Sequence, residues 1–175
     1  MQATATPTAA APAKAGESAI NPKLIVPFVN SVRAVFSTMV KVETTVQRPH
    51  VKANPALNYD VSSIIGFSGD VAGSVVVSFQ KDAAIKLVAS FAGMELAFGT
   101  PDFADAVGEL ANMIAGGAKK HLGNAASITV PSVIIGSGHQ IARLSDVPCV
   151  VIPCTSPVGD FAVEVNIKQL GNQGK

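Results

Sequence analysis

Apolar residues along this chain follow either the period of a helix or the pattern of a strand, and each change between the two marks the start of a new secondary-structure element. Apolar residues recur at helical spacing over residues 24–41, 81–91 and 100–123. Runs rich in β-branched residues predict strands over residues 42–48, 61–67, 73–79, 128–135, 148–152 and 161–167. Gly69-Asp70 separates two of these runs and predicts a tight hairpin.

The longest helix is expected over residues 100–123, where both ends carry signals. Thr100 can cap the first free amides, Pro101 suits the first helical position, and Gly123 suits a C-terminal stop. A buried stripe is expected along one side, formed by Val107, Leu110, Ala111, Ile114, Ala118 and His121. His121 is therefore interpreted as a packed residue rather than as a ligand.

The opposite side of this helix is polar. Glu109 and Asn112 lie about 60° apart around the axis, at about 100° per residue, so a carboxylate and a carboxamide project together. Four further residues fall near the same line and are candidate partner contacts: Asp105, Gly116, Lys119 and Lys120. Gly116 lowers helix propensity by roughly 1 kcal/mol relative to alanine, and such a glycine often marks the close approach of another surface. A solvated polar face is the alternative interpretation.

The N-terminal part of the chain predicts a tail followed by the first long helix. Residues 1–18 are mostly alanine, threonine and proline, which bury too little surface to offset the entropy of ordering. Asn21-Pro22 combines a cap with a first-turn proline, and Pro27 is expected to kink the helix or to mark a second start. We therefore expect a flexible tail at 1–18, one domain at 19–170 and a short tail at 171–175.

The order of the elements repeats, because each long helix is followed by β-rich segments. This order predicts an α/β (α+β) fold with two pseudo-symmetric halves, a largely antiparallel sheet and long helices on one face. In the first half, Pro27 and Asn30 occupy positions comparable to Glu109 and Asn112. Pro131 interrupts the strand over 128–135, which suits a sheet edge or a bulge.

Composition argues against several classes of function. Hydrophobic residues make up 48% of the chain, and the formal net charge of +1 argues against a nucleic-acid interface. No apolar stretch reaches the roughly 18 residues of a membrane span and no signal-peptide core is found, so a cytoplasmic protein is expected. Cys149 and Cys154 are expected to be core thiols that do not pair, because their odd offset places them on opposite faces of a strand.

The chain also lacks the common signatures of self-contained catalytic sites. It has no Walker-type phosphate loop, no metal-spaced His or carboxylate cluster, and no Ser-His-Asp or Cys-His set. No cofactor or metal is therefore expected within this chain.

Several of these features occur together in one known family. The segment Glu109-Leu110-Ala111-Asn112-Met113-Ile114-Ala115-Gly116 resembles the Glu-x-x-Asn helix of the CheC/CheX/FliY family, phosphatases of the chemotaxis response regulator CheY. The glycine-rich hairpin at 63–75 and the Thr-Val-Pro strand at 128–136 follow the order of the CheX branch. CheC-like members carry the motif in both halves, whereas Pro27 here replaces the first acid. Asn30 is therefore interpreted as structural.

The resemblance implies a hydrolase that acts on the aspartyl phosphate of a CheY-like response regulator. Asn112 would enter the phosphoaspartate site and orient the attacking water, while Glu109 would engage the regulator's active-site lysine. The divalent metal, usually Mg²⁺, would belong to the regulator. CheX-like proteins are similar in forming homodimers whose sheets continue across subunits, and the β-branched strands here predict edge pairing.

The sequence is also compatible with two other functions. The chain could be a regulator-binding or flagellar-switch-like scaffold without turnover, which would tolerate the loss of Asn112. A structural dimer with a solvated Glu/Asn pair is the third alternative.

Overall fold

The computed structural model describes residues 20–53, 59–141 and 147–170. The expected tails at 1–18 and 171–175 therefore lie outside the described residues. The helices are α1 (Pro22–Val35), continued by the π-helical turn η2 (Phe36–Val40), then α2 (Lys81–Ala92) and α3 (Pro101–Lys119). The strands are β1 (Thr45–Val46), β2 (His50–Val51), β3 (Tyr59–Ser68), β4 (Val71–Phe79), β5 (Ser127–Ile128), β6 (Ser132–His139), β7 (Val150–Thr155) and β8 (Phe161–Gln169).

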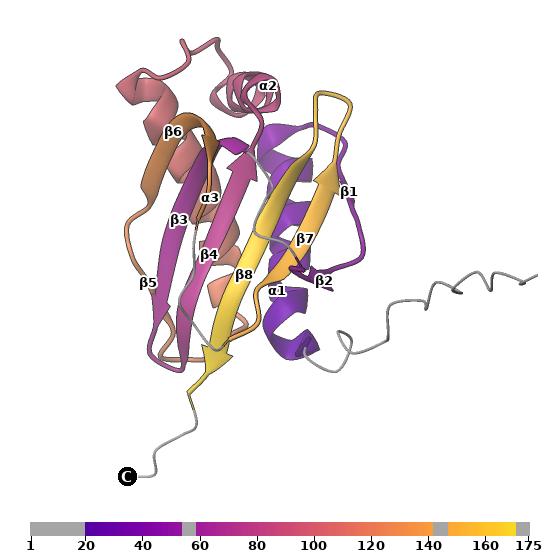
Figure 1. Ribbon diagram of the computed structural model, residues 1–175, viewed down its shortest axis with the longest axis vertical. Helices are drawn as coiled ribbons and strands as arrows, with labels where there is room; N and C mark the ends of the chain where they lie inside the picture. The colour runs from indigo at the N-terminus through magenta and orange to yellow at the C-terminus, as the bar shows by residue number, and fades with distance from the viewer. Residues whose placement is uncertain (1–19, 54–58, 142–146, 171–175) are drawn as a thin grey trace, which may run out of the picture.

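All described strands join one sheet, and every strand pair in it is antiparallel. The strand order is β1-β7-β8-β4-β3-β5, with β2 also paired to β7 and β6 also paired to β3. Helices α1 and α3 lie side by side against one face of this sheet, while α2 lies at one end (Figure 1). The predicted fold class is confirmed.

The two predicted halves are visible in the topology. The hairpin β3–β4 follows α1, the hairpin β7–β8 follows α3, and the two hairpins meet where β4 pairs with β8. Each half also contributes a strand broken by a proline, Pro49 between β1 and β2 and Pro131 between β5 and β6. Each broken strand pairs with the hairpin of the other half, so the halves interlock.

The predicted helix starts are confirmed by hydrogen bonds. Asn21 Oδ1 accepts from the Lys23 amide at 3.0 Å, and Thr100 Oγ1 accepts from the Phe103 amide at 3.3 Å. Helix α3 ends at Lys119, short of the stop predicted at Gly123. Gly123 instead adopts a φ of +140° in the turn that follows.

Two features of the first helix differ from expectation. Of the two outcomes expected at Pro27, the second start is wrong, because helix α1 runs through this residue. The stretch Pro22–Val40 is also long and apolar enough, by length and composition alone, to cross a membrane. In this fold the same stretch supplies Phe28, Phe36 and other residues to the core, and Phe36 stacks on Phe161 with ring centroids 4.5 Å apart. Packing therefore accounts for its apolar character.

Close contact between the two long helices depends on one glycine. A β-carbon on Gly117 of α3 would lie 2.2 Å from Ser31 Oγ of α1. The same hydroxyl donates to the Ile114 carbonyl at 2.7 Å and is buried there. Because Gly117 has no side chain, Ser31 of α1 can pack directly against α3. This packing leaves the polar side of α3 facing outward.

Substituting this glycine should destabilise the fold. We expect Gly117→Ala to lower the free energy of unfolding by about 1–3 kcal/mol, because the added methyl must displace Ser31. Gly116→Ala is the matched control: a β-carbon there meets no atom within 4 Å. It should be neutral or add up to about 1 kcal/mol through helix propensity. Urea unfolding of both variants tests this, and equal stability of the two would contradict it.

Candidate functional site

The outward side of α3 carries the predicted Glu109 and Asn112. Glu109 is exposed and Asn112 is half-buried on the helix surface. Among the described residues, neither side chain has a hydrogen-bond partner. Their neighbours Gly108, Leu110 and Ala111 are all buried, so the helix itself is fixed while these two polar groups stay available.

The candidate partner contacts lie on the same side of α3. Asp105 and Lys120 are exposed, and Gly116 and Lys119 are partly exposed. A β-carbon on Gly116 would meet no atom of the described residues within 4 Å, so those residues do not make the close approach inferred there. The glycine that accommodates a neighbouring helix is Gly117, one position further along.

A groove of about 600 Å³ runs between α1 and α3 beside this surface. Its lining includes Pro27, Asn30, Met113, Gly116, Lys120 and His121. The prediction that His121 packs in the core was wrong, because α3 ends before it and its side chain is exposed. Asn30 is also exposed, and no hydrogen bond to a described residue supports the structural role expected of it.

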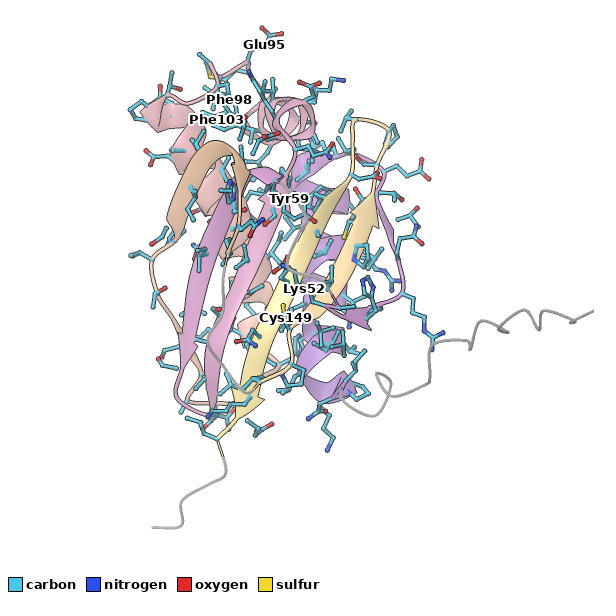
Figure 2. All side chains as sticks on the ribbon, viewed as in Figure 1. Lys52, Tyr59, Glu95, Phe98, Phe103 and Cys149 are labelled. Carbon is cyan, nitrogen blue, oxygen red and sulfur yellow. The ribbon has the colours of Figure 1, made fainter. Side chains whose placement is uncertain are left out.

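A second polar cluster lies on the opposite face of the sheet. Lys52 Nζ donates to Glu164 Oε1 at 2.7 Å, and Cys149 Sγ lies 3.7 Å from Glu164 Oε2. Figure 2 shows Lys52, Tyr59 and Cys149 over the sheet, away from α3. Burial, followed by the charges of Glu164 and Cys154, raises the pKa of the Tyr59 phenol to about 12. This cluster is separated from Glu109 and Asn112 by the sheet.

A third set of polar residues forms a hydrogen-bonded chain that runs inward from the edge strand β6 to β3 and β4. The ring of His139 contacts the Gly136 carbonyl through Nδ1 at 2.8 Å and Ser62 Oγ through Nε2 at 2.7 Å. Ser62 Oγ in turn lies 2.8 Å from Ser78 Oγ. The polar atoms of these side chains therefore find their hydrogen-bond partners within this chain of contacts.

The described residues contain no group of three or more His, Cys, Asp or Glu side chains that could hold a metal ion.

The two cysteines are not bonded to each other, as predicted: Cys154 is buried in the core, whereas Cys149 is half-buried. Burial raises the pKa of the Cys154 thiol to about 12, which keeps it protonated and unreactive at neutral pH.

Comparison with known proteins identifies the family. A sequence model of the family described as "Chemotaxis phosphatase CheX" matches residues 61–155. This chain belongs to the CheX family. The match runs from within β3 to the end of β7 and therefore includes the whole of α3.

Individual CheX relatives match almost their full length. The CheY-P phosphatase CheX of Thermotoga maritima is 27% identical over 153 residues, covering 85% of this chain and 98% of the relative. The crystal structure of CheX from Desulfovibrio desulfuricans is 34% identical with a TM-score of 0.76, covering 85% of this chain and 99% of that one. A CheX–CheY–BeF3–Mg²⁺ complex from Borrelia burgdorferi shares the fold, with 24% identity and a TM-score of 0.70, over 83% of this chain and 98% of that one.

The buried thiol allows a direct test of the core. In a Cys149→Ser variant, where Cys154 is the remaining cysteine, we expect a disulfide reagent at pH 8 to react only as fast as the protein unfolds. The reason is that Cys154 is both inaccessible and protonated. The labelling rate is measured with and without urea. Rapid labelling of the native variant would show that this part of the core opens readily.

Proposed function

We propose that this chain hydrolyses the aspartyl phosphate of a CheY-like response regulator in the cytoplasm, with α3 entering the regulator's active site. Membership of the CheX family and a relative known as a CheY-P phosphatase support this activity. The observation that carries the assignment to α3 is the pair Glu109 and Asn112. A carboxylate and a carboxamide stand one turn apart on a fixed helix, without partners among the described residues.

Asn112 is suited to positioning water. A carboxamide takes up no proton at neutral pH, so it is no general base, but it can both donate to and accept from one water molecule. Holding that water in line with the phosphorus atom removes part of the entropic barrier to attack. A glutamine performs comparable positioning in GTPases.

Glu109 supplies the negative charge beside this amide. In the proposed complex its carboxylate pairs with the regulator's active-site lysine, which would orient Asn112 toward the phosphoryl group. A general-base role is the chemical alternative for this side chain. The Mg²⁺ that neutralises the phosphoryl oxygens would be held by the regulator, because the reaction takes place in the regulator's own site.

The fold supports this role by keeping α3 in one position. The helix is capped by Thr100, attached to α1 through Ser31, and buried along its inner side. A group that is already oriented needs no reorganisation at the transition state, so a small number of polar side chains can contribute substantially.

Loss of the carboxamide should reduce turnover while leaving binding intact. We expect Asn112→Ala to slow regulator dephosphorylation by on the order of 10²-fold or more, the scale for one preorganised polar group. Affinity for the phosphorylated regulator should change little, because the interaction is made mainly in the transition state. Asn30→Ala is the matched control: it removes a carboxamide from the comparable position of α1, where Pro27 replaces the acid, and should leave the rate almost unchanged.

The regulators for this test are the single-domain response regulators of the same genome, each phosphorylated with acetyl phosphate. Phosphate decay is followed with and without the protein, and affinity is measured by titration. Full turnover by Asn112→Ala would contradict the phosphatase assignment and favour the binding module.

Glu109 should affect both binding of the regulator and hydrolysis of its phosphate if it pairs with a cation of the partner. We expect Glu109→Ala to impair hydrolysis and to weaken the complex, whereas Glu109→Gln should retain the shape but lose the ion pair. Measuring affinity at two salt concentrations separates the two contributions, since an ion pair is screened by salt. A complex equally tight and equally salt-dependent in all three proteins would exclude the proposed pairing.

We also propose a homodimer formed by pairing at the β6 edge. Strand β6 spans Ser132–His139 and pairs with β3 on one side, and its other side meets no described strand. The opposite edge consists of the two-residue strands β1 and β2, which offer much less backbone. An eight-residue edge with unpaired amides and carbonyls is a template for a second copy of the strand.

Light scattering at tens of micromolar protein should therefore give the mass of a dimer. Ile134→Lys places a charge on the β6 edge and should shift the mass toward the monomer. Leu170→Lys, at an exposed apolar position beyond β8, should leave the dimer intact. A monomer mass for the unmodified protein would contradict this proposal.

A further inference from the structure

One exposed apolar residue, Val130, immediately precedes Pro131, which contacts α3 next to the proposed active surface. Val130 is 83% exposed, compared with 62% for Met94 and 42% for Leu170 among the large hydrophobic residues that reach solvent. It lies in the short connection between β5 and β6. A single exposed valine is ordinary on a protein surface, so its setting has to decide whether it has a role.

The connection around Val130 is held in place on its first side by β3. The Thr129 amide donates to the Gly66 carbonyl at 3.0 Å, and the Gly66 amide donates to Thr129 Oγ1 at 3.0 Å. Thr129 Oγ1 also donates to the Val130 carbonyl at 3.0 Å. A β-carbon on Gly66 would lie 3.1 Å from Thr129 Cγ2, so the absence of a side chain there admits this close contact.

The second side of the connection is held by α3. A β-carbon on Gly108 would lie 3.1 Å from Pro131 Cγ and 3.6 Å from Val133 Cγ2, so Pro131 rests directly on the helix backbone. Gly108 immediately precedes Glu109 and lies one turn before Asn112, on the same side of the helix. Val130 is therefore adjacent in sequence to the residue that contacts α3 next to the Glu109–Asn112 pair.

From this arrangement we propose that Val130 is a docking residue, which packs against an apolar patch next to the phosphorylation site of the response regulator. The inference rests on the proposed function, because it extends the surface of α3 that enters the regulator. The polar face of α3 supplies charge and hydrogen bonds, and Val130 supplies apolar area at its border. Because the backbone around Val130 is already fixed, little conformational entropy is lost when a partner covers it.

The regulator is a better occupant of this position than a second copy of the chain. Edge pairing through β6 starts at Ser132 and uses the backbone of that strand. Val130 precedes it, in the connection that Pro131 holds against α3. The two occupants give different results in solution, since a dimer contact would change the mass of the free protein.

The experiment compares Val130→Asp and Val130→Ala with Leu170→Asp, a matched control on the surface beyond β8. Affinity is titrated with the regulator activated by Mg²⁺ and beryllofluoride, and KM and kcat are measured from phosphate decay. We expect Val130→Asp to weaken binding and raise KM by about tenfold or more, corresponding to 1.4 kcal/mol per factor of ten, with kcat unchanged. Val130→Ala should show a smaller loss of the same kind. Leu170→Asp should match the unmodified protein.

Three results would overturn the docking role. Unchanged affinity of Val130→Asp would show that the partner does not cover this residue. A fall in kcat at constant KM would show that the connection acts only by supporting α3. A monomer mass for Val130→Asp, where the unmodified protein is a dimer, would assign Val130 to the contact between copies.

The failure of the proposed function gives a different pattern. If the unmodified protein binds the activated regulator but does not speed phosphate decay, the phosphatase assignment fails while the affinity series still decides the role of Val130. If it neither binds nor hydrolyses, both proposals fall together. Melting temperatures of all variants confirm that each is folded.

Discussion

The contact between α1 and α3 at Gly117 is the constraint on which the proposed active surface depends. Ser31 fills the space that a side chain on Gly117 would occupy, and its hydroxyl donates to the Ile114 carbonyl at 2.7 Å. This contact fixes the rotation of α3 about its own axis. Because Glu109 and Asn112 lie away from the packed side, a fixed rotation gives both side chains one defined direction. A helix that could roll would present them only part of the time.

Local chemistry could predict α3 but could not identify its neighbours. The cap at Thr100, the buried stripe and the outward direction of Glu109 follow from residue types and helical period alone. Helix propensity and position on the polar side point to Gly116 as the site of close approach, whereas α1 packs against Gly117. His121 was projected onto the buried stripe by continuing the helical period past Lys119, where the helix ends.

The first helix illustrates how tertiary packing overrides a local signal. A proline inside a helix removes one hydrogen bond and crowds the preceding turn. Helix α1 nevertheless continues through Pro27, because Leu24 and Phe28 on either side are buried in the core and hold the chain in its helical path. The hydrogen bond lost at one residue is small beside the apolar burial gained along the whole helix.

The two halves of the fold are alike in topology but differ in the chemistry they can present. Pro27, at the position comparable to Glu109, is buried, and Asn30 stands alone beside the groove. A carboxylate at the buried position of Pro27 would lose much of its hydration, which is costly unless a partner compensates for it. The second half avoids that cost, because Glu109 lies on the exposed side of α3, and the closest approaches to the helix are made at Gly117 and Gly108, which have no side chains. Those two glycines let α1 and Pro131 approach the helix from its flanks, and the outer side of α3 stays open for a partner.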